Sequence, residues 1–260
     1  ISKQASHFII NFQPLRSQYE EIQKKYPQKF YIYFSYLNNA AWVGVNEREL
    51  FTGASTVKVP LAMTLLRSVE QGLIDLGTTY SLEQQDLNKD FGDLYKVGAG
   101  KNYSLEELMT YMLQDSDNTA ANGVMKSLNR IGLSSPLDDV YQAMGWDYNV
   151  FGEQPKYDKI TVKLLSNMFL ALYNATFISP EHSQMILDKL THTRFDEKIV
   201  AGIPKGIVVA HKVGIAPNQE TFVDCGIVYA PRRPYIMCLG SNGGDEEKAT
   251  AFMKEISAAT

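Results

Sequence analysis

The stretch from Gly206 to Asn242 decides the fold, because it holds three apolar runs with strand patterning close together in the chain. These runs are GIVVAHKVG (206–214), FVDCGIVYAP (222–231) and PYIMCLGSN (234–242). β-Branched and aromatic residues favour strands, and Pro231-Arg232-Arg233 provides a turn of hairpin length between the last two runs. This part of the chain is therefore predicted to be an antiparallel sheet, followed by a final helix that Asp245 caps.

The N-terminal part of the chain has the same strand texture. After a predicted helix over residues 14–25 come the runs KFYIYFSYL (29–37), AAWVGV (40–45) and RELFTG (48–53), which we interpret as an antiparallel meander. Between these strands and the C-terminal ones, the apolar residues follow the helical period. Helices are predicted over 57–71, 105–113, 118–128, 136–144, 161–173 and 180–190.

This order of elements predicts one structural unit with two lobes. Residues 1–54 and 203–260 form a sheet lobe with flanking helices, and residues 55–202 form an inserted all-α lobe. The fold class is α/β in its α+β form, with one antiparallel sheet built from both termini. Because ligand sites form in clefts between such units, the active site is expected at the interface of the lobes.

Composition and charge exclude several classes of function. The 260 residues are 45% hydrophobic and 21% charged, as in a folded globular protein. The net charge of −4 argues against a nucleic-acid partner bound through its phosphates. No stretch has the length and apolar character of a transmembrane segment, and the chain opens ISKQASHF, so we expect any signal or anchor to have been removed.

Three short motifs carry the candidate chemistry. Ser55 and Lys58 lie three residues apart at the start of a predicted helix, so they share one face, where a desolvated lysine can take the serine proton. Ser116-Asp117-Asn118 lies between two predicted helices, and Lys212 and Gly214 (HKVG) end a predicted strand. Taken singly, each motif also has a purely structural explanation, as a helix cap with a surface lysine, a second helix cap, or an edge-strand lysine before a turn.

Together the motifs follow the order S-x-x-K, S-D-N, K-T-G of class A β-lactamases and penicillin-binding proteins. The chain resembles this serine-acylating superfamily over nearly its whole length. FTGASTVKVPLAMTLL (51–66) is similar to the nucleophile helix, MLQDSDNTAANGVM (112–125) to the S-D-N segment and AHKVG (210–214) to the third motif. The resemblance implies a five-stranded antiparallel sheet flanked by an all-α lobe.

The resemblance also implies a role for each matching residue. Ser55 would be the acylated nucleophile, Lys58 the proton acceptor beside it, and Ser116 the relay toward the leaving nitrogen. Lys212 would supply positive charge near Ser116 and the substrate carboxylate. Asn118 would hold both the region around Lys58 and the substrate amide.

The backbone N–H groups of Ser55 and Ile215 would form the oxyanion hole, next to Gly214. Preorganised donors of this kind are worth about 3 kcal/mol each in acyl-transfer sites. Asp224 is either a buried carboxylate that supports Lys212 or a residue at a strand edge. No metal or organic cofactor is implied, because the nucleophile, the relay and the oxyanion donors are all protein groups.

The sequence departs from the superfamily in its deacylation and carboxylate-binding motifs. It lacks the E-x-x-x-N motif whose Glu activates water in class A enzymes; Glu153 is the nearest candidate, but Tyr157 stands four residues later, and Glu153 is more simply a solvated turn residue. Val213 replaces the Thr or Ser of the third motif, and Phe222 stands where a cation would be wanted. These departures predict acylation followed by slow deacylation.

We therefore expect an extracytoplasmic, monomeric serine hydrolase or acyltransferase that acts on a β-lactam or on a D-Ala-D-Ala-like peptide, such as a peptidoglycan stem peptide. One alternative is a D,D-peptidase of the penicillin-binding type. The other is a cell-wall or β-lactam sensor that binds, or is acylated, without turnover. A binder that had lost all chemistry would not need Ser55, Lys58, Ser116 and Lys212 together.

The two cysteines of the chain are Cys225 and Cys238. They fall nearly opposite one another if the last hairpin turns at Pro231-Arg232. We expect two buried free thiols, because directly adjacent strands strain most disulfides, with a cross-strand disulfide as the alternative.

Overall fold

A five-stranded antiparallel sheet forms the centre of the computed structural model, which describes residues 11–146, 159–216, 218 and 220–260. The strand order is β2-β1-β9-β8-β7. These strands are β1 (Lys29–Tyr36), β2 (Trp42–Val45), β7 (Val209–Ala216), β8 (Thr221–Val228) and β9 (Tyr235–Asn242). The N-terminal β1 pairs with the C-terminal β9 along its whole length, from Lys29 opposite Asn242 to Tyr36 opposite Tyr235. The predicted α/β class, with one sheet built from both ends of the chain, is confirmed.

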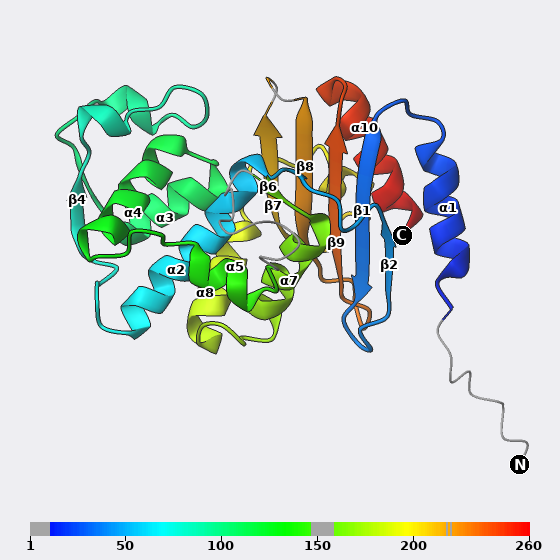
Figure 1. The fold of residues 1–260 in the computed structure, drawn as a ribbon, viewed down its shortest axis with the longest axis horizontal. Helices are drawn as coiled ribbons and strands as arrows, with labels where there is room; N and C mark the ends of the chain where they lie inside the picture. The colour runs from blue at the N-terminus through cyan, green and yellow to red at the C-terminus, as the bar shows by residue number, and fades with distance from the viewer. Residues whose placement is uncertain (1–10, 147–158, 217, 219) are drawn as a thin grey trace, which may run out of the picture.

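Three helices cover one face of this sheet. They are α1 (Gln13–Gln23), α9 (Ile199–Gly202) and α10 (Glu246–Ala259), and Figure 1 shows α1 and α10 on the side away from the other helices. Alternate side chains of β1 face them, and the ring of Phe30 stacks on Phe252 of α10. The intervening Tyr31 and Tyr33 face the opposite core. The two-residue period of a strand thus gives the sheet a separate apolar core on each face.

The other face supports the helical part of the chain (Figure 1). Its elements are α2 (Lys58–Glu70), α3 (Leu105–Gln114), α4 (Asn118–Arg130), α5 (Asp138–Ala143), α7 (Val162–Tyr173), α8 (Pro180–Leu190) and the short 3-10 helices η1 (Ala54–Val57), η2 (Gln84–Asp86) and η3 (Leu94–Val97). Local signals set most of the starts: Ser104 and Glu107 form the predicted capping box of α3, and Ser179 caps α8 just before Pro180. In the described residues, no helix has the length and hydropathy of a membrane span.

The helix predicted from residue 136 begins later, at Asp138. Ser135 and Pro136 form a turn instead, in which the Asp138 N–H donates to the Ser135 carbonyl. The carbonyl of Pro136 accepts a hydrogen bond of 2.6 Å from the Thr64 hydroxyl of α2. The turn is therefore held by a tertiary contact that a capping rule does not anticipate.

Four short strands lie outside the main sheet. They are β3 (Phe51–Thr52) paired with β6 (Lys159–Ile160), and β4 (Thr79–Ser81) paired with β5 (Asn102–Ser104). The prediction that residues 48–53 are part of the N-terminal meander is therefore wrong. The Phe51 ring is buried and stacks on Tyr31 with centroids 4.7 Å apart, so β3 crosses over the face of the sheet instead of extending its edge.

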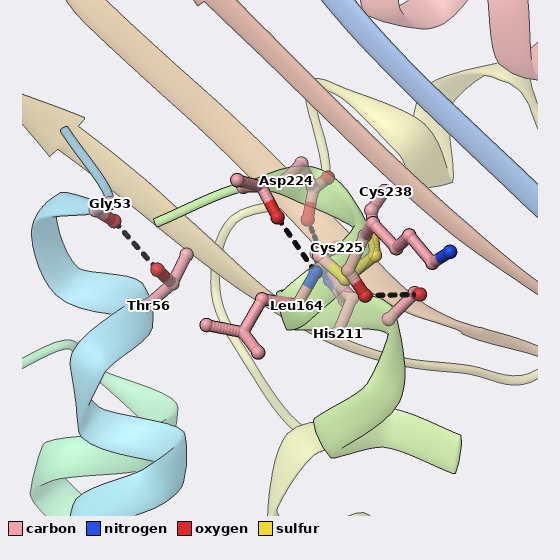
Figure 2. The surroundings of a disulfide bond; sticks show 10 residues. Gly53, Thr56, Leu164, His211, Asp224, Cys225 and Cys238 are labelled. Carbon is pink, nitrogen blue, oxygen red and sulfur yellow. Dashed lines mark hydrogen bonds and ion pairs between the residues drawn. A yellow bond between two sulfur atoms is a disulfide. The ribbon is translucent and has the colours of Figure 1, made fainter. Parts of the chain in front are cut away.

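Cys225 and Cys238 are joined by a disulfide, so the expectation of two free thiols is wrong. The two residues are direct partners in the pairing of β8 with β9, and their Cα atoms are 3.9 Å apart. Their side chains point to the same face of the sheet, where they are buried near Leu164 of α7 (Figure 2).

Candidate active site

Ser55 lies in η1, directly before α2. The preceding turn is closed by Thr56, whose backbone N–H and hydroxyl both donate to the Gly53 carbonyl, at 3.1 and 2.7 Å (Figure 2). Ala54 adopts a left-handed backbone with φ of 46°, which turns the chain from β3 into η1. Ser55 is left 9% exposed, at the wall of a cavity.

Lys58 is buried beside this serine. Its Nζ donates to Ser55 Oγ at 2.7 Å and to Asn118 Oδ1 at 2.6 Å. Burial lowers the pKa of Lys58 to about 8, although the charge of Asp117 acts in the opposite direction. A lysine with this pKa is partly unprotonated near neutral pH, so its amine can accept the proton of a serine hydroxyl.

The S-D-N segment forms the sharp turn between α3 and α4. Asp117 caps α4 by accepting from Ala120 N at 2.9 Å, and its other oxygen accepts from Leu94 N at 2.8 Å. Ser116 has a left-handed φ of 56° and is buried. The turn lets Ser116 contact Lys212 and Asn118 contact Lys58.

Lys212 of β7 is the partner of Ser116. Its Nζ donates to Ser116 Oγ at 2.8 Å and to the Val213 carbonyl at 3.1 Å, and the Phe195 ring centroid lies 5.8 Å away. Burial lowers the pKa of Lys212 well below its ordinary value, the charge of Lys58 lowers it further, and Asp224 opposes both. A lowered pKa makes the Lys212 ammonium a stronger proton donor toward Ser116, and its role as a positive charge near the substrate stays a prediction.

The site opens into a cavity of about 540 Å³ between the sheet and the helices. Ser55, Lys58, Asn118 and Ile215 all line it. Gly214, just before Ile215, is needed for this approach, because a Cβ at that position would lie 2.5 Å from the Gly53 carbonyl oxygen. The structure thus brings the predicted residues of all three motifs together, while the pairing of two backbone N–H groups into an oxyanion hole stays a prediction.

Asp224 is a buried residue and not a strand-edge one, but its partner is His211. Its Oδ1 lies 2.8 Å from His211 Nδ1, and its Oδ2 accepts from Ile199 N at 3.0 Å (Figure 2). Because side chains alternate along β7, His211 and Lys212 point to opposite faces of the sheet. Burial by itself lowers the pKa of His211, but the Asp224 carboxylate outweighs it, and the pKa is raised. Asp224 therefore supports His211 directly and acts on Lys212 only through its charge.

Sequence reasoning missed residues that have no motif. Asp90 and Phe91 line the cavity from the loop before η3, and Asn88 of the same loop hydrogen-bonds Asn118. No periodicity marks this loop, and only its polar composition hints at a site. Glu153 lies outside the described residues.

Two residues at which the sequence departs from the superfamily are buried in the core of the structure. Phe222 packs in the core under α10, and Val213 is buried. Within the described residues, no group of three His, Cys, Asp or Glu side chains could hold a metal ion.

The comparisons with family models and curated proteins match beta-lactamases. The model of the beta-lactamase enzyme family matches residues 14–260. The chain is 24% identical over 241 residues to Beta-lactamase 3 of Bacillus cereus, covering 88% of this chain and 74% of that protein. It is 26% identical over 225 residues to the extended-spectrum beta-lactamase PER-1 of Pseudomonas aeruginosa, covering 79% and 72%.

Solved structures share the fold. PBP-A superposes with a TM-score of 0.84 at 22% identity, over 95% of this chain and 94% of that one. A beta lactamase from Xanthomonas campestris pv. campestris superposes with a TM-score of 0.83 at 21% identity, over 96% and 98%. Because the family match covers residues 14–260, and Ser55, Lys58 and Asn118 line one cavity while Ser116 and Lys212 are hydrogen-bonded to each other, the chain belongs to the beta-lactamase enzyme family and is a hydrolase of the β-lactamase type.

Proposed function

We propose that β-lactams acylate Ser55. The observation that carries this proposal is the distance of 2.7 Å between Lys58 Nζ and Ser55 Oγ, with the pKa of Lys58 lowered by burial to about 8. Lys58 takes the hydroxyl proton as Ser55 Oγ bonds to the lactam carbonyl carbon. The lactam C–N bond then breaks, leaving an ester on Ser55.

The leaving nitrogen needs a proton, and we assign its delivery to the Ser116 hydroxyl. Its hydroxyl lies 2.8 Å from Lys212 Nζ, from which it can be reprotonated. The N–H groups of Ser55 and Ile215 would stabilise the oxyanion that forms before the bond breaks. The Asn118 amide, which lines the same cavity, would bind the amide of the substrate side chain.

Deacylation is proposed to be slow. The sequence has no E-x-x-x-N motif, and Glu153 is the remaining candidate for activating water. The lack of an E-x-x-x-N motif, together with Val213 in place of a hydroxyl residue, also favours a second candidate function. This is a penicillin-binding D,D-peptidase, or a sensor, that keeps its acyl group. The substrate of this second candidate function would be a D-Ala-D-Ala-like peptide.

We place this activity outside the cytoplasm and assign it to a monomer. The Cys225–Cys238 disulfide supports the location, because structural disulfides persist in oxidising compartments. The proposed chemistry uses only protein groups, so no cofactor is assigned.

The test is an intact-mass time course of the protein with a penicillin and with a cephalosporin. The Ser55→Ala variant removes the nucleophile, and Ser127→Ala is a matched control, because that buried hydroxyl donates to the Gly123 carbonyl inside α4. An adduct that disappears as the drug is consumed indicates a β-lactamase. A lasting adduct indicates the peptidase or sensor. An adduct that persists in Ser55→Ala, or no adduct and no consumption of the drug, refutes acylation of Ser55 by β-lactams.

A further inference from the structure

Asn88 lies outside the three motifs and joins its loop to the S-D-N segment at two points. Its side-chain Oδ1 accepts from Asn118 Nδ2 at 3.2 Å and from Asp90 N at 2.9 Å. Its backbone N–H donates to Thr119 Oγ1 at 3.0 Å, and the Thr119 hydroxyl donates back to the Asn88 carbonyl at 3.4 Å. The loop after η2 is thereby attached to the first turn of α4.

The side-chain bond sets the orientation of the Asn118 amide. With Nδ2 bonded to Asn88, Asn118 Oδ1 faces Lys58 Nζ at 2.6 Å. An amide turned over would place its N–H groups against the lysine and its oxygen against the oxygen of Asn88, and both hydrogen bonds would be lost. The amide nitrogen carries two N–H groups, so one is left for an acceptor in the cavity that Asn118 lines.

The same oxygen also positions the wall of the cavity. Asp90, whose N–H it accepts, and Phe91 both line the cavity, and the Phe91 carbonyl accepts from Asn118 N at 3.0 Å. One acceptor atom of Asn88 therefore links the loop wall, the Asn118 amide and, through that amide, Lys58.

We propose that Asn88 is a positioning residue for the acylation of Ser55, and that the property it supplies is one oxygen accepting from both Asn118 and Asp90. This inference rests on the proposed function of Ser55. It predicts that Asn88→Asp, which keeps an acceptor oxygen, retains the role. Asn88→Leu, which keeps only the size of the side chain, loses it.

The experiment measures acylation of the full chain by a penicillin as a function of pH, with the binding constant and the acylation rate separated. Asn122→Leu is the matched control, because Asn122 Nδ2 joins α4 to the end of η2, directly before this loop, through the Asp86 carbonyl at 2.9 Å and does not contact Lys58. We expect Asn88→Leu to slow acylation about 10-fold or more, mainly in the rate step, because small misplacements near reacting atoms are costly. Asn122→Leu should retain the wild-type rate.

The pH dependence separates positioning from general loosening of the loop. Asp117 and Lys212 are the charged groups that interact with Lys58, Asp90 lines the same cavity, and the variants change none of them. When Asn118 Oδ1 no longer accepts from Lys58, the ammonium loses a partner, so the acid limb of the rate should move to lower pH in Asn88→Leu. In Asn88→Asp the added carboxylate should move it to higher pH, with the plateau rate retained.

A readout independent of acylation is the pair of side-chain amide NMR signals of Asn118, assigned with Asn118→Ala. These signals should shift in Asn88→Leu and stay near their wild-type positions in Asn122→Leu. The inference is overturned if Asn88→Leu keeps both the wild-type acylation rate and the wild-type pH dependence of that rate. It is also overturned if Asn88→Asp is acylated as slowly as Asn88→Leu, or if the Asn118 amide signals do not shift in Asn88→Leu. A wild-type chain that no penicillin acylates would refute the proposed function instead, and the amide signals would still decide the role of Asn88.

Discussion

The rate at which a penicillin acylates Ser55 should rise with pH along the titration of Lys58. Lys58 Nζ is the basic atom beside the serine hydroxyl, 2.7 Å from Oγ, and only its unprotonated form can accept the proton. The perturbations are a change of pH, which varies the free amine, and Lys58→Arg, which keeps a cation but cannot lose its proton.

The expected magnitude follows from burial. At pH 7, a pKa of about 8 leaves about 9% of Lys58 as free amine, whereas the ordinary lysine value of 10.5 leaves about 0.03%. Burial of Lys58 thus increases the reactive fraction about 300-fold. The rate should rise about tenfold for each pH unit below the pKa and level off above it, and Lys58→Arg should lower the plateau by about 10²–10⁴-fold.

The assay is intact-mass spectrometry of samples quenched early in the reaction, at subsaturating penicillin, from about pH 6 to about pH 10. Circular dichroism at each pH verifies that the protein stays folded. Lys126→Arg is the control, because Lys126 forms ion pairs with Glu83 and Asp86 and does not line the cavity. A rate that is flat across this range, or a Lys58→Arg variant acylated as fast as the wild type, would refute the reasoning.

Three further outcomes can be checked by thermal or urea unfolding. Gly214→Ala should lower the free energy of unfolding by about 1–3 kcal/mol and slow acylation, because the new Cβ would lie 2.5 Å from a backbone carbonyl oxygen; an unchanged melting temperature would contradict this. The raised pKa of His211 beside Asp224 contributes stability that is fully present below about pH 6.5 and is lost as the pH rises through the folded-state value; His211→Gln should flatten that dependence, and a slope equal to the wild type would count against it. Replacing both Cys225 and Cys238 by Ala should cost about 2–4 kcal/mol, and a reductant should destabilise the wild type but not the double variant.

Sequence signals were sufficient where the determining interaction is local. The helix predicted over 180–190 matches α8, because Ser179 and Pro180 specify its start within one turn. The contact between Ser55 and Lys58 was also predictable, since residues three apart in a helix share a face. The pairing of the terminal strands into one sheet followed from apolar strand patterning at both ends of the chain.

Signals failed where the determining partner is distant in the chain. Nothing local indicates that residues 48–53 pair with β6 instead of extending the sheet, or that the Pro136 carbonyl accepts a hydrogen bond from Thr64 of α2. The predicted hairpin did place Cys225 opposite Cys238, but whether the two thiols join depends on how closely the packed strands β8 and β9 bring them together, and the expectation of free thiols was wrong.

The sequence by itself therefore determined the architecture, the candidate nucleophile and the order of the motifs, because helical spacing, strand alternation and capping are short-range properties of the backbone. Only the tertiary structure decided the chemistry of the groups. The pKa of Lys58 depends on burial, the Ser116–Lys212 bond joins α3–α4 to β7, and the link from Asn88 to Asn118 crosses two segments that carry no shared pattern. Desolvation and hydrogen-bond partnership arise only when distant parts of the chain exclude water together.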